Sequence, residues 1–362
     1  MSEMKDIAPR VDPREFHRVF HAVRAELGKV VVGQERVVEH LLVAVFAGGH
    51  VLLTGMPGLG RTLLVKALAE ILALDYSRLQ FTPDLLPTDI IGAEILESHH
   101  STGARSFRFF RGPVFANLVL ADEINRSPAR TQAALLEVMQ ERQVTAGGRT
   151  YFLPRPHLIV ATQNTLDTDG VWGLGEAQTD RFMMSIEQDY PSEAEERRIL
   201  AATTGSAEAR VRAVTGPETI LAMQALTREV PVVPSVRDFA LHMVRGSRPG
   251  ECDAVGEATA AVRLGASPRA AQALLLGGKV TALARGRTHV TRQDVIDVAR
   301  PVLAHRLLMD FRAQAEGADY RGVLDALIAH AQEKTLPPTS RWEREHLSRA
   351  ARGQSPGAAQ KR

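Results

Sequence analysis

The spacing of hydrophobic positions changes near residue 190. Before it, short apolar runs alternate with stretches of helical spacing such as 129–141, and two helices are predicted first, over 13–26 and 34–47. The apolar runs are 51–53, 77–81, 118–121, 158–162 and 182–186. Uninterrupted apolar runs are typical of parallel strands that are buried on both faces. Strands that alternate with helices indicate an α/β fold.

After residue 190 the spacing is helical throughout. Ser192 followed by Glu195, and Thr291 followed by Asp294, are typical pairs at the start of a helix. The predicted helices are 193–203, 217–227, 235–245, 268–286, 291–308 and 320–333. We therefore predict a second domain that contains only helices.

Domain boundaries follow from these changes of pattern. We place the α/β core at 15–191, the helical domain at 192–317 and a last helix at 318–334. Residues 1–14 are polar and contain proline, and residues 335–362 are basic and rich in Gly, Ser and Ala. Both end segments are predicted to be flexible.

Composition narrows the class of protein. The 362 residues carry a net charge of +2, which gives no bulk attraction to nucleic acid. The single cysteine, Cys252, fits a reducing compartment. The N-terminus lacks the features of a signal peptide, and the apolar stretch 41–53 is too short to cross a bilayer. We expect a cytoplasmic protein with no membrane insertion and no nucleic-acid partner.

A Gly-rich segment follows the first apolar run. It comprises Gly55, Met56, Pro57, Gly58, Leu59, Gly60, Arg61 and Thr62, and it leads into a helical stretch. This is the arrangement of a nucleotide-binding P-loop, in which backbone N–H groups surround a phosphate at a helix N-terminus. Thr62 is the expected Mg²⁺ ligand. Arg61 stands where the pattern asks for Lys, and the two side chains are not interchangeable.

Two further polar positions follow apolar runs. Asp122 and Glu123 end the run 118–121, where we expect Asp122 to hold Mg²⁺ and Glu123 to deprotonate the attacking water. Asn164 follows the run 158–162. If that strand lies between the P-loop strand and the acidic strand, Asn164 reaches the γ-phosphate side; taken alone, it is a strand-end cap.

These features resemble the MoxR-type AAA+ ATPases over about residues 30–306. The resemblance is carried by the ordered segments 31–34, 48–53, 80–87, 121–126, 133–144, 176–182 and 264–269. It implies an AAA+ P-loop core, whose parallel sheet is sandwiched by helices, followed by an all-α lid domain. It also implies binding of ATP and Mg²⁺.

Several residue roles come from the resemblance alone. Val31, Val32 and Gly33 match the segment that borders the adenine, and Asn164 matches the sensor-1 residue. Arg269 matches the sensor-2 arginine. Arg181 matches the arginine finger, which points into a neighbouring subunit's site. A finger of this kind implies a homo-oligomeric ring, expected to be a hexamer.

Two segments match insertions of the family. Residues 83–111 resemble the insert in the second core helix, and 143–154 resemble a β-hairpin with Gly147 and Gly148 at its turn. They are candidate contacts for a client or ordinary surface loops. The resemblance implies a chaperone-like remodeller or maturation factor, with a von Willebrand factor A domain protein as client.

Three departures from the family pattern concern catalysis. They are Arg61, Thr165 in place of a usual proline, and the segment 170–175 before Arg181. The other polar positions of the site are retained, which favours turnover. The alternative is a nucleotide-binding scaffold with weak or no hydrolysis because of Arg61. A DNA-directed motor is disfavoured by the small net charge.

Other residues are assigned no role in the chemistry. The adjacent His99 and His100 are expected in a solvated loop, since neighbouring side chains point apart. His305 and Arg306 are expected to pack or to balance a helix end rather than to bind a ligand. Trp172 fits a subunit contact and a partly buried aromatic equally well.

Overall fold

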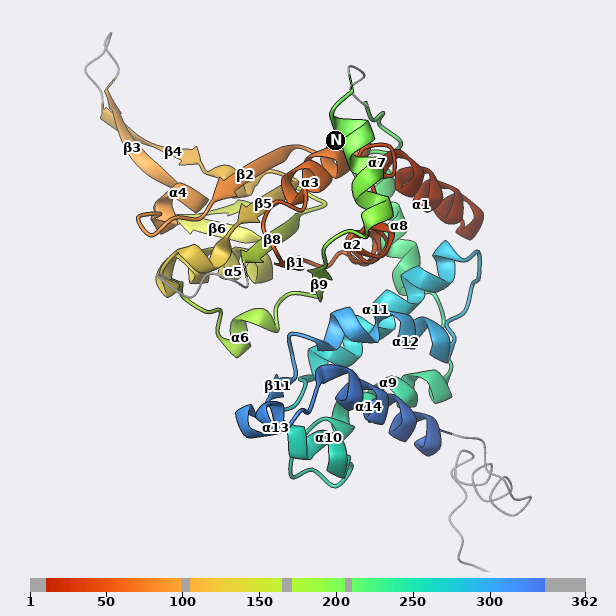
Figure 1. The fold of residues 1–362 in the computed structure, drawn as a ribbon. Helices are drawn as coiled ribbons and strands as arrows, with labels where there is room; N and C mark the ends of the chain where they lie inside the picture. The colour runs from red at the N-terminus through yellow and green to blue at the C-terminus, as the bar shows by residue number, and fades with distance from the viewer. Residues whose placement is uncertain (1–10, 99–104, 165–170, 206–209, 336–362) are drawn as a thin grey trace, which may run out of the picture.

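A five-stranded parallel sheet lies at the centre of the N-terminal half of the computed structural model (Figure 1). The structure describes residues 11–98, 105–164, 171–205 and 210–335. In spatial order the strands are β2 (Tyr76–Gln80), β5 (Leu118–Asp122), β8 (Leu158–Asn164), β1 (Val51–Gly55) and β9 (Met184–Gln188). The predicted α/β fold is confirmed, and β8 lies between β1 and β5.

Alternate residues of the strands belong to two separate hydrophobic clusters. Val51 and Leu53 of β1 pack with α1 (Pro13–Leu27), α2 (Glu35–Ala47) and α3 (Arg61–Ile71). On the opposite face, Leu52 packs with α4 (Pro87–Ile91) and α5 (Ala129–Glu141). Because successive side chains of a strand point to opposite faces, an uninterrupted apolar run fills both clusters.

The two insertions form antiparallel hairpins. In the first, β3 (Gly92–Ser98) pairs with β4 (Arg105–Arg111), and the hairpin projects away from the sheet (Figure 1). In the second, β6 (Gln143–Ala146) pairs with β7 (Arg149–Phe152), as predicted. Gly147 and Gly148 have φ values of 54° and 72°, so both central residues of this turn are left-handed. Phe109 stacks on Tyr151 with ring centroids 4.4 Å apart, which joins the two hairpins.

Short helical segments complete the core domain. The 3-10 turns η1 (Pro113–Phe115) and η2 (Ile124–Arg126) flank β5, and α6 (Glu176–Thr179) precedes β9.

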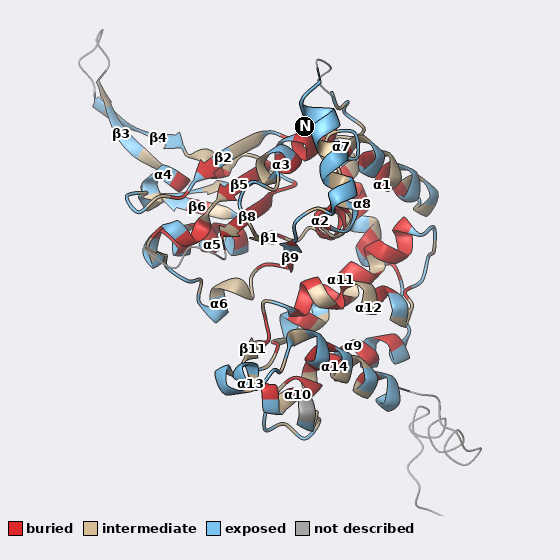
Figure 2. Ribbon diagram, in the orientation of Figure 1, coloured by how far each residue is buried: buried red, intermediate tan, exposed pale blue. Residues whose placement is uncertain are grey.

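The C-terminal half is helical apart from one small two-stranded pair. Its helices are α7 (Glu193–Thr203), α8 (Pro217–Glu229), α9 (Pro234–Gly246), α10 (Gly256–Ala261), α11 (Pro268–Ala284), α12 (Arg292–Leu303), α13 (Phe311–Ala315) and α14 (Tyr320–Lys334). Both predicted capping pairs are present, at Ser192 and at Thr291. The burial map shows α7 as an exposed helix and α11 as a largely buried one (Figure 2).

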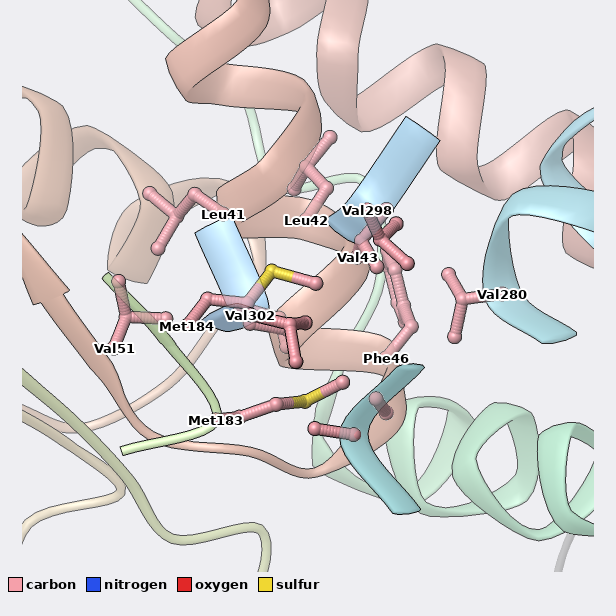
Figure 3. Packing of buried hydrophobic residues seen from close by; sticks show 14 of the residues in the cluster. Leu41, Leu42, Val43, Phe46, Val51, Met183, Met184, Val280, Val298 and Val302 are labelled. Atoms are coloured by element: carbon pink, nitrogen blue, oxygen red, sulfur yellow. The ribbon is translucent and has the colours of Figure 1, made fainter. Parts of the chain in front are cut away.

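One continuous core joins the two halves. Figure 3 shows Phe46 of α2, Val51 of β1 and Met184 of β9 in the same cluster as Val280 of α11 and Val298 of α12. Packing of this kind holds the lid against the end of the sheet at which β1 begins. The carboxyl end of β9 also meets the lid, where Arg300 Nη2 of α12 lies 2.8 Å from Glu187 Oε2.

Two predicted boundaries are wrong for identifiable reasons. The strand predicted at 182–186 is β9, which begins two residues later, because the Phe182 N–H donates to the Thr179 carbonyl in a turn after α6. The helix predicted over 291–308 ends at Leu303, because Leu308 and Met309 form β11 (Leu308–Met309), which pairs with β10 (Val262–Leu264).

The N-terminal segment is shorter than predicted. Val11 is buried, and the Asp12 side chain accepts the Glu15 N–H, so the fold begins before residue 15. Most of the predicted basic tail, 336–362, lies outside the described residues, as do Thr165 and the pair His99 and His100. Among the described helices, none combines the length and the apolar character needed to cross a membrane.

Candidate functional site

The loop after β1 adopts the backbone conformation that its glycines permit. Gly55, Gly58 and Gly60 have φ values of 126°, 81° and 73°. A Cβ at Gly55 would lie 2.3 Å from the Gln188 carbonyl oxygen, so this position requires glycine. The segment containing Pro57 and Leu59 then passes into α3, whose first residue is Arg61. Thr62 therefore lies in the first turn, where unpaired N–H groups favour an anion.

Asp122 and Glu123 lie at the carboxyl end of β5, and both form hydrogen bonds with the hydroxyl of Thr162. The Thr162 hydroxyl donates to Asp122 Oδ1 at 2.7 Å and accepts the Glu123 N–H at 2.8 Å. Glu123 has a left-handed backbone, with φ of 57°. A left-handed glutamate is uncommon and has to be held by its surroundings. Here the Thr162 contact supplies that support.

Two side chains of β2 contact the same acids. Arg78 Nη2 lies 2.6 Å from Asp122 Oδ2 in an ion pair. Gln80 donates from Nε2 to Glu123 Oε2 at 3.0 Å, and Arg126 Nε lies 3.3 Å from the same oxygen. Both carboxylates are thus oriented from the neighbouring strand and from the turn that follows β5.

Asn164 lies beside the P-loop. It ends β8, pairs in register with Gly55 and is buried. Its carbonyl oxygen accepts a hydrogen bond from Asn125 Nδ2 at 3.1 Å. The condition set by the sequence, that this strand lies between the P-loop strand and the acidic strand, is met.

Arg61 is held by three contacts across the loop. Its Nε donates to Gln188 Oε1 at 2.7 Å, Nη2 donates to the Met56 carbonyl at 3.0 Å, and Nη1 donates to the Gln163 carbonyl at 3.3 Å. Burial lowers the pKa of the Arg61 guanidinium, while the charges of Asp122 and Glu123 act in the opposite direction. The positive charge of the Arg61 guanidinium therefore lies close enough to the Asp122 and Glu123 carboxylates to interact with them electrostatically.

A cleft of about 960 Å³ opens beside the P-loop strand, between the core and α12. Gln34, Thr54, Gln163 and Gln188 are among its lining residues. Val31, Val32 and Gly33 line a smaller cavity of about 230 Å³, and Gly33 belongs to both cavities. The Glu195 side chain packs on Gly33, where a Cβ would lie 2.7 Å from Glu195 Cδ.

The two predicted arginines of the ring and lid lie apart from this cleft. Arg269 Nη1 is 3.4 Å from Asp180 Oδ2, and neither Arg269 nor Arg181 lines the cleft. Arg181 is half-buried, and its side chain makes no hydrogen bond or ion pair with any residue in the described part of the chain. The structure thus assembles the P-loop, the acids and Asn164, and the hydrogen bonds and ion pairs of the described residues do not join either arginine to them.

Arg306 and His305 join the lid to the core. Arg306 Nε donates to Asp180 Oδ1 at 2.9 Å, and Nη1 donates to the Met183 carbonyl at 3.0 Å. His305 Nε2 lies 3.0 Å from the Phe182 carbonyl, and burial lowers the His305 pKa to about 3. Both residues pack in a joint between the halves, in agreement with the structural interpretation from the sequence.

The segment before α6 is anchored to the core. The Trp172 N–H donates to the Asn125 carbonyl at 2.9 Å, and the Trp172 carbonyl accepts from Gln132 Nε2 at 3.1 Å. The indole remains partly exposed, so a role in a subunit contact stays a hypothesis.

Sequence reasoning missed four residues of the site: Arg78, Gln80, Thr162 and Gln188. Thr162 had a usable signal, because it lies two positions before Asn164 and therefore on the same face of the strand. Gln80 and Gln188 each end a strand of the sheet. A polar residue at the end of a strand led to the prediction of Asp122 as a site residue, and the same reasoning was not applied to Gln80 and Gln188.

Comparison with known proteins places this site in a family. A model described as "ATPase family associated with various cellular activities (AAA)" matches residues 50–184, and a model of the AAA lid domain matches 257–325. The chain is 42% identical to "Chaperone MoxR1" of Mycobacterium tuberculosis over 302 residues, 83% of this chain and 78% of that protein. It is 33% identical to "Protein MoxR" of Paracoccus denitrificans over 312 residues, 82% and 90% of the two chains.

A solved structure agrees with these matches. The crystal structure of a candidate ATPase from Cytophaga hutchinsonii superposes with a TM-score of 0.80 at 37% identity, covering 88% of this chain and 96% of that one. The predicted AAA+ core and helical lid are thereby confirmed. The chain belongs to the MoxR family of AAA+ ATPases.

Proposed function

We propose that this chain binds and hydrolyses ATP with Mg²⁺ and uses the reaction to remodel a partner protein. The observation that carries the proposal is the meeting of the P-loop, the acids Asp122 and Glu123, and Asn164 at the ends of three adjacent strands. Ligands of open α/β sheets bind at the carboxyl ends of the strands.

The residues present suit a nucleotide with its metal. The left-handed glycines leave open space at Gly58 and Gly60, where backbone N–H groups can approach a phosphate. Thr62 and Asp122 supply the hydroxyl and carboxylate oxygens that Mg²⁺ prefers. Bound there, Mg²⁺ would neutralise phosphate charge. The cleft beside the loop is of the size of small-molecule sites in general.

The proposed reaction assigns separate tasks to the polar side chains. Glu123, oriented by Gln80 and by the Thr162 hydroxyl, accepts the proton of the attacking water. Asn164 helps to position that water, and the Arg61 guanidinium contacts the phosphates. Arg269 is proposed to act once its contact with Asp180 is exchanged for one with the nucleotide.

The proposal includes a homo-oligomeric ring, expected to be hexameric. Its support is Arg181, a half-buried guanidinium without a partner in the described part of its own chain. A finger supplied by a neighbouring subunit stabilises charge on the transferred phosphoryl group.

The projecting hairpins are proposed to contact the client. They expose large apolar side chains: Ile95 and Phe107 on the first hairpin and Phe152 on the second. Phe107 and Phe152 are 71% and 75% exposed, and apolar side chains that gather on an exposed surface are typical of protein-interaction sites. The client we propose carries a von Willebrand factor A domain, on the family resemblance. We place the reaction in the cytoplasm, with no nucleic-acid partner.

One observation favours a second function, a nucleotide-binding scaffold without useful hydrolysis. Arg61 is already engaged with Gln188, Gln163 and Met56, and a guanidinium held in this way could bind phosphate without supporting transfer. The two functions share nucleotide binding and differ only in turnover.

The affinity for ATP, measured by calorimetry with and without Mg²⁺, tests the shared step. The wild type is expected to bind ATP more tightly when Mg²⁺ is present, and Thr62→Val is expected to lose that difference because it removes the hydroxyl ligand. Thr62→Ser, which keeps the hydroxyl, is the control and should retain it. A wild type that does not bind ATP contradicts both functions.

A further inference from the structure

Arg61 belongs to a chain of hydrogen bonds that begins and ends in the phosphate-binding loop. Arg61 Nε donates to Gln188 Oε1 at 2.7 Å, and Gln188 Nε2 donates to Gln34 Oε1 at 2.8 Å. Gln34 Nε2 in turn donates to the Leu59 carbonyl at 2.9 Å. Residues from β9, from the start of α2 and from the loop itself thus form one closed network.

The network places the guanidinium across the mouth of the loop. Met56 follows the first glycine and Arg61 follows the last, so the bond from Arg61 Nη2 to the Met56 carbonyl spans the loop. The bond from Nη1 to the Gln163 carbonyl reaches the end of β8, next to Asn164. A guanidinium has five N–H donors, and these contacts together with the Gln188 bond use three of them. Donors therefore remain for a phosphate oxygen.

The position of the Gln188 side chain suits an arginine at position 61 and not a lysine. Its acceptor bonds to Nε, a donor partway along the side chain, whereas a lysine carries donors only at its end. Gln188 is 2% exposed, so water has little access to Oε1. A lysine at position 61 would leave this buried acceptor without its donor, which is unfavourable.

We propose that Gln188, together with Gln34, is a positioning residue that holds the Arg61 guanidinium over the loop and so makes arginine the phosphate-binding cation of this site. The inference rests on the proposed binding of ATP. Arg61→Lys restores the usual motif, yet it impairs nucleotide binding as long as Gln188 is present.

A double-mutant cycle on the full chain tests this inference. ATP, ADP and AMP affinities are measured with Mg²⁺ for the wild type, Gln188→Leu, Arg61→Lys and the double variant, with AMP measured by competition. Gln188→Leu is expected to weaken ATP and ADP binding about tenfold, a coupling typical of residues in contact, and to leave AMP binding unchanged. In the Arg61→Lys background the same substitution is expected to cause no weakening.

Gln224→Leu is the matched control. Gln224 is partly buried, less fully than Gln188, and its Nε2 donates to the Val45 carbonyl at 2.9 Å; it belongs to α8 and does not line the cleft. It should change none of the affinities. Thermal unfolding of each variant without nucleotide checks that all of them fold.

The outcomes separate the two claims. Additive effects of Gln188→Leu and Arg61→Lys, or an equal loss of AMP binding, overturn the positioning role and leave the proposed function standing. A wild type that binds no nucleotide overturns the proposed function and this inference with it. A higher ATP affinity in the double variant than in Arg61→Lys alone supports directly the proposal that Gln188 is suited to Arg61 and not to lysine.

Discussion

Thr162 is the residue through which both acids of the site are held. It is 1% exposed, its hydroxyl donates to Asp122, and the same oxygen accepts the Glu123 N–H. The Thr162 hydroxyl is one of the contacts that hold the left-handed backbone of Glu123, together with the Arg126 N–H that donates to the Glu123 carbonyl. The orientation of the proposed base therefore depends on a side chain from the neighbouring strand.

Thr162→Val should lower the kcat for ATP hydrolysis by about tenfold or more, because a misplaced base loses much of its effect. It should also lower the free energy of unfolding by about 1–3 kcal/mol, since the Glu123 N–H loses its acceptor. Steady-state kinetics and urea denaturation measure the two effects. Thr162→Ser keeps the hydroxyl and should behave like the wild type. An unchanged kcat in Thr162→Val would show that the hydroxyl does not position Glu123.

The sequence predicts those site residues whose neighbours along the chain reveal them. Gly55, Asp122 and Asn164 each come one or two residues after an apolar run, and the structure places all three at one edge of the sheet. The partner of Arg61 was not predictable in this way, because Gln188 is 127 residues away in the chain. That pairing exists only because β9 lies beside β1.

At the scale of elements, the alternation of buried strand residues decides which helices cover each face. Hydrophobic spacing predicted whether a segment is a strand or a helix. It did not predict where the segment begins or ends, as the start of β9 and the end of α12 show. Ends depend on turn hydrogen bonds and on pairing with distant strands. The β10–β11 pair is an example, since each of its strands is too short to produce a pattern.

His50 connects three elements of the core. It precedes β1, its Nδ1 accepts the Ile159 N–H of β8 at 3.0 Å, and its Nε2 lies 3.3 Å from the Met139 carbonyl of α5. These partners require the neutral imidazole with the proton on Nε2. Burial, and secondly the neighbouring His157, lowers the His50 pKa to about 3, and burial lowers the His157 pKa to about 4.

Acid should therefore destabilise the protein in a range set by these histidines. In the unfolded chain a histidine takes up a proton below about pH 6.5, whereas the folded protein resists protonation until pH 3–4. Their contribution to stability is complete above about pH 6.5 and is lost as the pH falls below it, by up to about 1.4 kcal/mol per pH unit for each histidine.

Urea denaturation of the wild type and of His50→Gln between pH 7.5 and 5 measures this effect. The variant lacks one of the titrating groups, so its stability should decline less steeply with falling pH. Equal slopes for the two proteins would show that His50 is not held neutral by the fold.

At the scale of the whole molecule, the joint between core and lid adjoins the proposed arginine finger. Asp180 contacts Arg306 and Arg269 of the lid and immediately precedes Arg181. A movement of the lid would therefore change how Arg181 is presented to a neighbour. Sequence spacing predicted two domains but could not place one against the other, because the joint is made by contacts between distant residues.

Mixing two inactive variants tests the ring. Glu123→Gln lacks the proposed base and Arg181→Ala lacks the proposed finger, so each should be inactive alone. If the finger acts on the neighbouring site, an equal mixture should recover about a quarter of the wild-type ATPase activity, because about that share of sites pairs an intact Glu123 with a neighbour's Arg181. Either an active Arg181→Ala variant or no recovery after subunit exchange would contradict a finger supplied by a neighbour.

The central claim is that the edge of the sheet formed by β5, β8 and β1 is a working ATPase site. Steady-state ATP hydrolysis with Mg²⁺ by the full chain, compared with Glu123→Gln, tests it most directly. We predict measurable turnover in the wild type and a loss of at least about 100-fold in the variant, the effect expected for removal of a general base. A wild type that binds ATP but does not hydrolyse it, or equal rates for both proteins, would contradict the claim.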